Sequence, residues 1–208
     1  MKKIKICGIT DKKEAGYLNE AGVDYAGFVL FFPKSKRNME IERAKEIMAL
    51  LDPHIKAVAV VVEPTAGQLD EIMEAGFDLV QIHGEMTDEV LSGIRIPMLK
   101  AFNVSDLSEF ERYEKMDRVA GYVFDAQIPG SGTVFDWDML QKLPKTEKLT
   151  FLAGGLDHGN VKDALAATGV DGVDTSSGVE RADGNGKDPQ KIYQFVGEYI
   201  FNRIQDSC

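Results

Sequence analysis

The feature that most constrains the fold of this chain is a short pattern that recurs three times. It reads AGVDYAGF from Ala21, AGFDLVQI from Ala75 and TGVDGVDT from Thr168. In each copy a glycine can take the left-handed conformation that ends a helix, and an apolar residue and an aspartate then lead into a β-rich run. The pattern predicts repeated units in which a helix is followed directly by a strand.

Eight β-rich runs alternate with amphipathic segments along the chain. We expect strands over Ile4–Cys7, Tyr25–Phe31, Ile55–Val62, Leu79–His83, Met98–Phe102, Gly121–Asp125, Leu149–Ala153 and Gly172–Thr175. Helices are expected over Asp11–Ala21, Glu40–Leu51, Ala66–Ala75, Asp106–Glu114 and Val161–Ala167. Capping-box spacing marks two helix starts, and a cap before a first-turn proline marks a third; these are Asp11 with Glu14, Thr65 with Gln68, and Asp188 with Pro189.

The repeat length bounds the architecture. Eight units in 208 residues leave 26 residues for each, which is enough for a strand, a helix and two short loops. No linker rich in Ser, Gly or Pro interrupts the series, so we expect residues 1–208 to form one catalytic domain. An α/β fold with eight parallel strands favours a single (β/α)₈ TIM barrel over an open doubly wound sheet, which usually has about six strands.

Composition excludes several partners. The net charge of -10 repels phosphate backbones and anionic lipid, so we expect no nucleic-acid and no membrane partner. No apolar run approaches the roughly 18 residues of a spanning helix, and the first ten residues lack a signal-type core, which predicts a cytoplasmic location. The two cysteines, Cys7 and Cys208, do not make a disulfide framework and are expected to be reduced thiols.

In such a barrel, the chemistry lies at the carboxyl ends of the strands and in the loops that follow them. Cys7 lies there by position, and so do Arg37, Gln81, His83, Asp125 and Asp174. The segments AGGLDHGN from Ala153 and TSSGVE from Thr175 follow the seventh and eighth strands. Glycines and serines there let backbone N–H groups converge on oxyanions. We therefore expect a phosphorylated small molecule at Gly154, Gly155, Ser176, Ser177 and Gly178.

Six segments in collinear order resemble phosphoribosylanthranilate isomerase of tryptophan biosynthesis. They are KICGIT, GFVLFFPKSKR, QIHG, FDA with GSGTVFDW, FLAGGL and GVDTSSGVE. The resemblance spans nearly the whole chain. It implies an Amadori rearrangement of N-(5'-phosphoribosyl)anthranilate, with no metal and no organic cofactor.

The resemblance also implies individual roles. Cys7 would be the general base that removes the C2 proton, and Asp125 the general acid that protonates the furanose oxygen. Arg37 would hold the anthranilate carboxylate, which suits its planar fork. Two positions depart from the family pattern: Lys36 replaces the proline of the usual SPR triplet, and Pro129 lies in a shortened loop after Asp125.

Each of these residues also has a structural interpretation. Cys7 can be a buried core thiol, Asp125 a helix cap and Arg37 a solvated loop charge. Gln81 and His83 can be a hydrogen-bonded pair at the barrel mouth, and Asp174 can bind substrate or orient a neighbour. The three histidines, His54, His83 and His158, lie on different units, so we expect no metal site.

Two other functions remain open at this level. A different phosphosugar reaction, such as an epimerase or aldolase, usually needs a metal set or a Schiff-base lysine, and Lys100 could point inward from its strand. A non-enzymatic phosphosugar binder needs no acid and base pair. We further expect a monomer or homodimer, a Cys7 thiol with a lowered pKa, and room for substrate beside Gly8.

Overall fold

The computed structural model describes residues 2–104, 107–125 and 144–205, with side chains described through residue 198. The helices and strands are β1 (Lys3–Cys7), α1 (Lys12–Ala21), β2 (Tyr25–Leu30), β3 (Asn38–Met39), α2 (Ile41–Met48), β4 (Lys56–Val62), α3 (Ala66–Glu74), β5 (Leu79–His83), α4 (Asp88–Gly93), β6 (Met98–Asn103), α5 (Phe110–Glu114), β7 (Val119–Asp125), β8 (Leu149–Ala153), α7 (Val161–Thr168), β9 (Gly172–Thr175), the 3₁₀ turn η1 (Ser177–Val179) and α8 (Pro189–Gln205). Several residues of the sequence-based interpretation lie outside the described residues, namely Asp106, Ala126, Pro129, the motif GSGTVFDW at 130–137, and Cys208.

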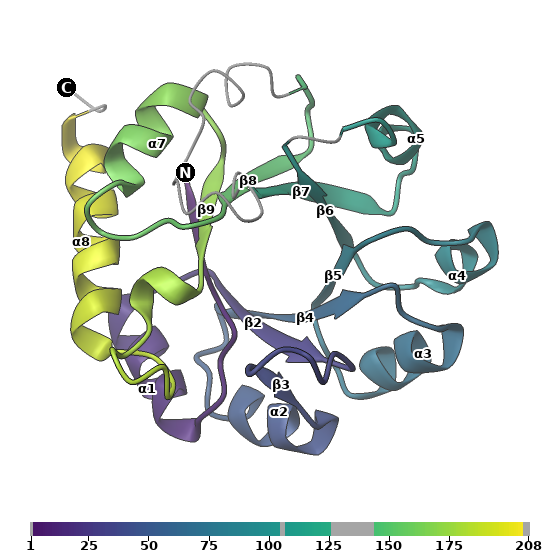
Figure 1. Cartoon of the computed structure of the whole chain (residues 1–208), viewed down its shortest axis with the longest axis horizontal. Coiled ribbons are helices and arrows are strands. Elements are labelled where there is room, and N and C mark those ends of the chain that lie inside the picture. Colours follow the sequence, from purple (N-terminus) through teal and green to yellow (C-terminus); the bar gives the residue numbers. More distant parts are fainter. Residues whose placement is uncertain (1, 105–106, 126–143, 206–208) are drawn as a thin grey trace.

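The strands form one parallel sheet that closes on itself. Its order is β1-β9-β8-β7-β6-β5-β4-β2, and β1 also pairs with β2. The helices form a ring outside the sheet (Figure 1). The predicted (β/α)₈ barrel is confirmed, with strand bounds within two residues of those expected. A ninth strand, the two-residue β3 beside the end of β2, was not predicted, because two residues carry no alternation. That residues 1–208 form one catalytic domain stays a prediction.

Alternating side chains divide the barrel into two cores. Nine residues that point inward fill the barrel, namely Tyr25, Val58, Val60, Leu79, Leu99, Ala101, Val123, Phe151 and Ala153. The residues between them, such as Ile82, Phe124 and Leu152, pack outward against the helices in a larger core. The inward positions at the carboxyl ends of the strands carry polar groups instead, which prepares this end for a site.

Helix termini follow the predicted signals. Asp11 and Thr65 each accept a hydrogen bond from a first-turn N–H, and both capping boxes are complete. Gly22 and Gly169 take the left-handed conformation that ends α1 and α7, with φ of 66° and 67°. Helix α2 is shorter than expected. It ends at Met48, and the N–H groups of Leu50 and Leu51 bond three residues back, in a 3₁₀-like turn.

The aspartate of the recurring pattern has a structural role that the sequence did not specify. Asp24, Asp78 and Asp171 stand at the amino ends of β2, β5 and β9, and each carboxylate reaches the neighbouring strand. The three carboxylates accept N–H groups of Ile4, Ala57 and Thr150, each at 2.9 Å. These contacts join adjacent strands at the end of the barrel opposite the polar one. No helix in the described part of the chain is long and apolar enough to cross a membrane.

Candidate active site

A cavity of about 450 Å³ opens at the carboxyl ends of the strands. Its walls hold ten of the eleven predicted site residues: Cys7, Arg37, Gln81, His83, Asp125, Gly154, Gly155, Asp174, Ser176 and Ser177. Gly178 does not line the cavity. A Cβ at Gly178 would lie 1.9 Å from the Leu156 carbonyl oxygen, so this glycine allows the two loops to pack closely. These residues come from six different strands or their loops, and only the closed barrel brings them together.

Cys7 lies at the base of this cavity, above a buried ion pair. The Lys5 ammonium, fully buried on the same strand, donates to Asp174 Oδ2 at 2.8 Å. Burial raises the pKa of the Cys7 thiol, and the ammonium groups of Lys5 and Lys187 act in the opposite direction. The expectation of a lowered thiol pKa is therefore wrong for the chain without ligand, because desolvation outweighs the nearby cations.

Gln81 and His83 form the side wall on β5. The Gln81 amide nitrogen lies 2.9 Å from His83 Nε2, so the hydrogen-bonded pair predicted from their alternation is present. Burial, with help from Lys5 and Lys100, lowers the pKa of His83 to about 4. The imidazole is therefore neutral near pH 7. Two buried oxygens, Gln81 Oε1 and Asp174 Oδ1, have no hydrogen-bond partner among the described residues. Buried acceptors of this kind favour a ligand that brings hydroxyl donors.

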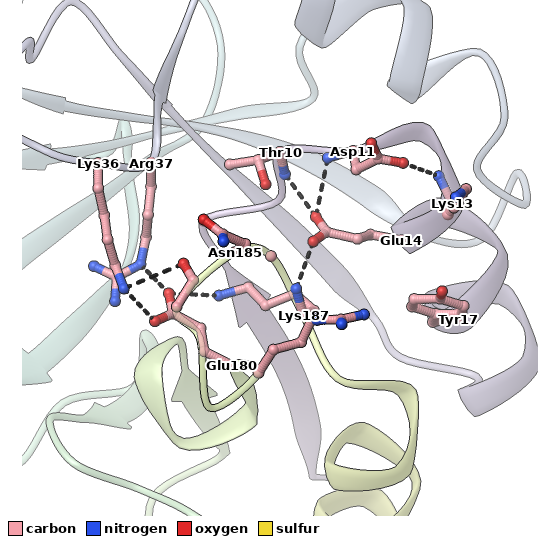
Figure 2. A pocket seen from close by; sticks show the side chains of 14 residues that line it. Thr10, Asp11, Lys13, Glu14, Tyr17, Lys36, Arg37, Glu180, Asn185 and Lys187 are labelled. Carbon is pink, nitrogen blue, oxygen red and sulfur yellow. Dashed lines mark hydrogen bonds and ion pairs between the residues drawn. The ribbon is translucent and has the colours of Figure 1, made fainter.

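Arg37 spans this cavity and a second one of about 480 Å³ beside it. Its aliphatic stem lies directly on the Gly8 backbone, since a Cβ at Gly8 would fall 2.3 Å from Arg37 Cδ. The space beside Gly8 thus holds Arg37, and the expectation that it is left for substrate is wrong. Arg37 Nε donates to Glu180 at 2.6 Å, and Lys36 Nζ donates to the same carboxylate at 2.8 Å (Figure 2). Within the described residues, the two terminal nitrogens of Arg37 have no hydrogen-bond partner, so they remain for a ligand.

The loops after β8 and β9 form the part of the cavity wall at which the anion cradle is predicted. Gly154 and Gly155 adopt φ of 95° and 65°, which side-chain-bearing residues rarely adopt. Ser176 is fixed on both sides: its hydroxyl donates to the Cys7 carbonyl at 2.9 Å and accepts from Lys187 Nζ at 3.2 Å. Two glycines and two serines line this part of the cavity, and such small residues leave the backbone accessible to an anion.

The sequence was compared with protein families and with curated relatives. Residues 4–198 match the model of N-(5'-phosphoribosyl)anthranilate (PRA) isomerase. A curated N-(5'-phosphoribosyl)anthranilate isomerase of Geotalea uraniireducens is 41% identical over 94% of this chain and 97% of its own length. The chain belongs to the phosphoribosylanthranilate isomerase family.

Solved structures agree with this family. The phosphoribosylanthranilate isomerase of Thermotoga maritima matches with a TM-score of 0.84 and 35% identity, over 97% of this chain and all of the other. A second isomerase structure, in complex with reduced 1-(o-carboxyphenylamino)-1-deoxyribulose 5-phosphate, matches with a TM-score of 0.82 and 33% identity, with the same coverage. The resemblance noted from the six motifs is confirmed.

Lys100 is not part of the isomerase cavity. Its neighbours Leu99 and Ala101 belong to the barrel interior, so its own side chain points outward to the helix layer. The ammonium donates to the Gly84 and Ala101 carbonyls and lies 5.1 Å from the Tyr113 ring centroid. The suggestion that Lys100 could point inward and form a Schiff base is therefore wrong.

Four residues that support the walls of the candidate site were missed from the sequence. Lys5 pairs with Asp174 beside Cys7, Glu180 accepts a hydrogen bond from Arg37, and Lys187 donates one to Ser176. Glu14, predicted only as a capping residue, accepts the Lys187 N–H at 2.6 Å and so ties the last loop to the start of α1 (Figure 2). Alternation along KIKIC places Lys5 on the same face as Cys7, and this signal could have found it. The other three act across loops that only the folded chain brings together.

Asp125 ends β7 at the cavity wall, three strands along the ring from β1 and Cys7. Its backbone carbonyl accepts the N–H of Val104, which fixes the strand end beside β6. Whether Asp125 also caps a helix falls outside the described residues. In the described ranges, no group of three His, Cys, Asp or Glu side chains is arranged to hold a metal ion.

Proposed function

We propose that this isomerase converts N-(5'-phosphoribosyl)anthranilate to 1-(2-carboxyphenylamino)-1-deoxyribulose 5-phosphate, in tryptophan biosynthesis, with Cys7 as general base and Asp125 as general acid. The observation that carries this assignment is the single cavity that Cys7 and Asp125 share with Arg37 and the glycine–serine loops. An acid, a base, a carboxylate-binding fork and a phosphate cradle match the four chemical demands of this substrate.

Asp125 and Cys7 carry out the first two proton transfers of the proposed reaction. Asp125 donates a proton to the furanose ring oxygen while the C1–O bond breaks, and the anthranilate nitrogen forms a C1=N iminium. Cys7 then removes the C2 proton, and the C–H electron pair moves into the C1–C2 bond as the iminium nitrogen recovers its lone pair. The resulting enolamine tautomerises to the 2-ketone. A buried thiol can serve here because the cationic iminium next to it favours the thiolate.

The remaining groups fit the ends of the substrate. Arg37, held by Glu180 through Nε, can direct its two terminal nitrogens to the anthranilate carboxylate in a bidentate contact. Gly154, Gly155, Ser176 and Ser177 surround the position proposed for the phosphate. The unpaired oxygens of Gln81 and Asp174 would accept ribose hydroxyls between these two ends. Gly178, which packs away from the cavity, acts only through loop packing.

Fluorescence of the anthranilate-type substrate tests the proposal. Substrate made in place from anthranilate and phosphoribosyl pyrophosphate loses its fluorescence on turnover, and we expect Cys7→Ser and Asp125→Asn each to reduce kcat by at least about 100-fold. Asp163→Asn is the matched control, because Asp163 is exposed on α7. Full activity in Cys7→Ser would show that Cys7 is a structural thiol and not the base. Substrate binding without turnover by the unaltered chain would indicate a binding protein.

Assembly and location stay predictions. A Thermotoga maritima structure describes monomers generated from a dimeric phosphoribosylanthranilate isomerase. A monomer or homodimer of this chain in the cytoplasm is therefore the expectation, and gel filtration with light scattering tests the first part. We propose that the reaction itself needs no organic cofactor, since the acid, the base and the binding groups above supply each step.

A further inference from the structure

The proposed mechanism gives no role to the Lys5 ammonium, which is buried in an ion pair with Asp174 beside Cys7. Lys5 is fully buried and Asp174 is 6% exposed, and their charged atoms are 2.8 Å apart. Burying an ammonium in a barrel core is costly unless another group pairs with it. An apolar residue would fill this inward position at lower cost, so the presence of a lysine needs a reason.

The Lys5 ammonium pairs with Asp174 and also lies near the Cys7 sulfur. Lys5 and Cys7 are alternate residues of β1, so both side chains enter the barrel. A Cβ built at Gly27, on the neighbouring strand, would lie 3.0 Å from Cys7 Sγ and 3.1 Å from Lys5 Nζ. The sulfur and the ammonium thus converge on one point that glycine leaves open. Asp174 faces Lys5 in register from the other side, on β9.

The charges around the sulfur come from every neighbouring element. Lys5 lies on its own strand, Asp174 on β9 and Lys187 in the loop after η1, while Arg37, His83 and Asp125 face it across the cavity. Burial lowers the pKa of Lys5, but Asp174 and Cys7 raise it above its usual value, so the side chain keeps its charge. His83 is neutral near pH 7, and Lys187 is drawn toward Ser176 and Glu180. Lys5 lies on the same strand as Cys7, and of the cations it has the largest electrostatic effect on the thiol.

We propose that Lys5 is a positioning residue for Cys7: its ammonium, anchored by Asp174, holds the sulfur at the cavity floor and stabilises the thiolate. This inference deepens the function proposed above and rests on Cys7 being the base. In the ground state Lys5 and Asp174 neutralise each other. When Cys7 gives up its proton, the ammonium is shared between two anions, and the thiolate gains a partner without any movement of the chain.

Alkylation of Cys7 by iodoacetamide tests the proposal without substrate. In a Cys208→Ser background, Cys7 is the only cysteine of the sequence. We expect Lys5→Met to shift the pH profile of the alkylation rate upward by about one pH unit, which is about ten-fold slower reaction at pH 8. Lys5→Arg restores most of the rate. Lys3→Met is the matched control, since Lys3 on the same strand pairs with Asp24 instead. A Lys5→Met profile that coincides with that of Lys3→Met would overturn the proposal.

A second variant separates electrostatics from loss of packing and remains informative if Lys5→Met does not fold. Asp174→Asn removes the competing anion and leaves the whole ammonium to Cys7, so its alkylation profile moves to lower pH. A merely structural ion pair would move both variants in the same direction, or neither. A downward shift in Asp174→Asn supports the role of Lys5, and an unchanged or upward profile rejects it.

The isomerase assay then separates this inference from the proposed function. We expect Lys5→Met to lower kcat about ten-fold or more with little change in KM, because Lys5 does not line the substrate cavity. If Lys5→Met and Asp174→Asn shift the alkylation profile in opposite directions but the unaltered chain shows no isomerase activity, the effect of Lys5 on Cys7 is supported and the proposed function is rejected. Full kcat in a folded Lys5→Met variant would keep the function and reject the inference.

Discussion

Replacing Glu180 by glutamine tests how the loops after β2 and β9 are joined at the edge of the active site. The carboxylate is 10% exposed and accepts from Arg37 at 2.6 Å and from Lys36 at 2.8 Å. Glutamine has nearly the same shape, but it carries no charge and keeps one acceptor oxygen. The substitution therefore removes the electrostatic part of the contact and leaves the packing almost unchanged.

The structure gives the size of the expected effect. Burial alone raises the pKa of Glu180, but hydrogen bonds from Arg37 and Lys36 outweigh it and bring the pKa from 4.5 to about 2. That change corresponds to about 3 kcal/mol in favour of the ionised form. Lys36 is 55% exposed, so its share is screened by water, and we expect the free energy of unfolding to fall by about 2 kcal/mol.

Urea unfolding of both chains at several pH values measures this contribution. Because the folded-state pKa is below the unfolded one, the stabilisation is complete above about pH 5 and is lost as the pH falls from about 4.5 towards 2. We therefore expect a constant gap between wild type and Glu180→Gln near neutral pH that narrows below about pH 4.5. The melting temperature should fall by about 4–8 °C for a chain of this size.

A matched surface pair provides the control. Glu46 also bridges two cations, Lys12 and Arg43, but its side chain is 53% exposed. Glu46→Gln should leave stability unchanged within error. In the fluorescence assay, Glu180→Gln should raise KM about ten-fold, since Arg37 loses the group that fixes its fork. Equal stability of the two variants at pH 7, with the same KM, would refute the reasoning.

Two further substitutions test the packing at opposite ends of the barrel. Gly8→Ala places a Cβ 2.3 Å from Arg37 Cδ, at a residue with φ of 74°. We therefore expect KM to rise at least about five-fold in the isomerase assay. An unchanged KM would show that Arg37 can bind the substrate without packing on the Gly8 backbone. Asp78→Ala removes the acceptor of the Ala57 N–H, and urea unfolding should show a loss of about 1–3 kcal/mol. Asp70→Ala is the control, because it breaks only an exposed ion pair, and it should change the free energy of unfolding by less than about 0.5 kcal/mol. Similar losses in the two aspartate variants would contradict the conclusion that Asp78 joins two strands.

The sequence predicted the barrel because its strands and helix ends carry strong local signals. The three glycine–aspartate exits and the capping boxes depend only on neighbouring residues, and those elements lie where they were expected. The location of Cys7 and Asp125 at one cavity followed from the rule that the carboxyl ends of the strands meet at one face. This prediction needed only the strand bounds and no knowledge of side-chain contacts.

Side-chain direction and long-range pairing were harder to predict. Lys100 lies in a strand that is apolar on both faces, and such strands show no alternation to say which face is inward. Room for substrate was expected beside Gly8, but Arg37 from the next loop fills this space. Nothing near Lys5 in the sequence indicates that its partner is Asp174. Burial at Cys7 likewise depends on the closed barrel, which is why the sign of its pKa change was wrong.

Because the barrel closes at β1, the surroundings of Cys7 depend on the order of folding. Strand β1 bonds both to β2 and to β9, and the contact between Lys5 and Asp174 joins residues 169 positions apart. During synthesis the amino-terminal strand emerges first and the strand that completes the ring emerges last. Until that last strand docks, the Lys5 ammonium lacks Asp174, and the Cys7 thiol is accessible to solvent and to oxidants. Refolding experiments should therefore recover activity only with ring closure, after most helices have formed, so turnover reports the final step of assembly.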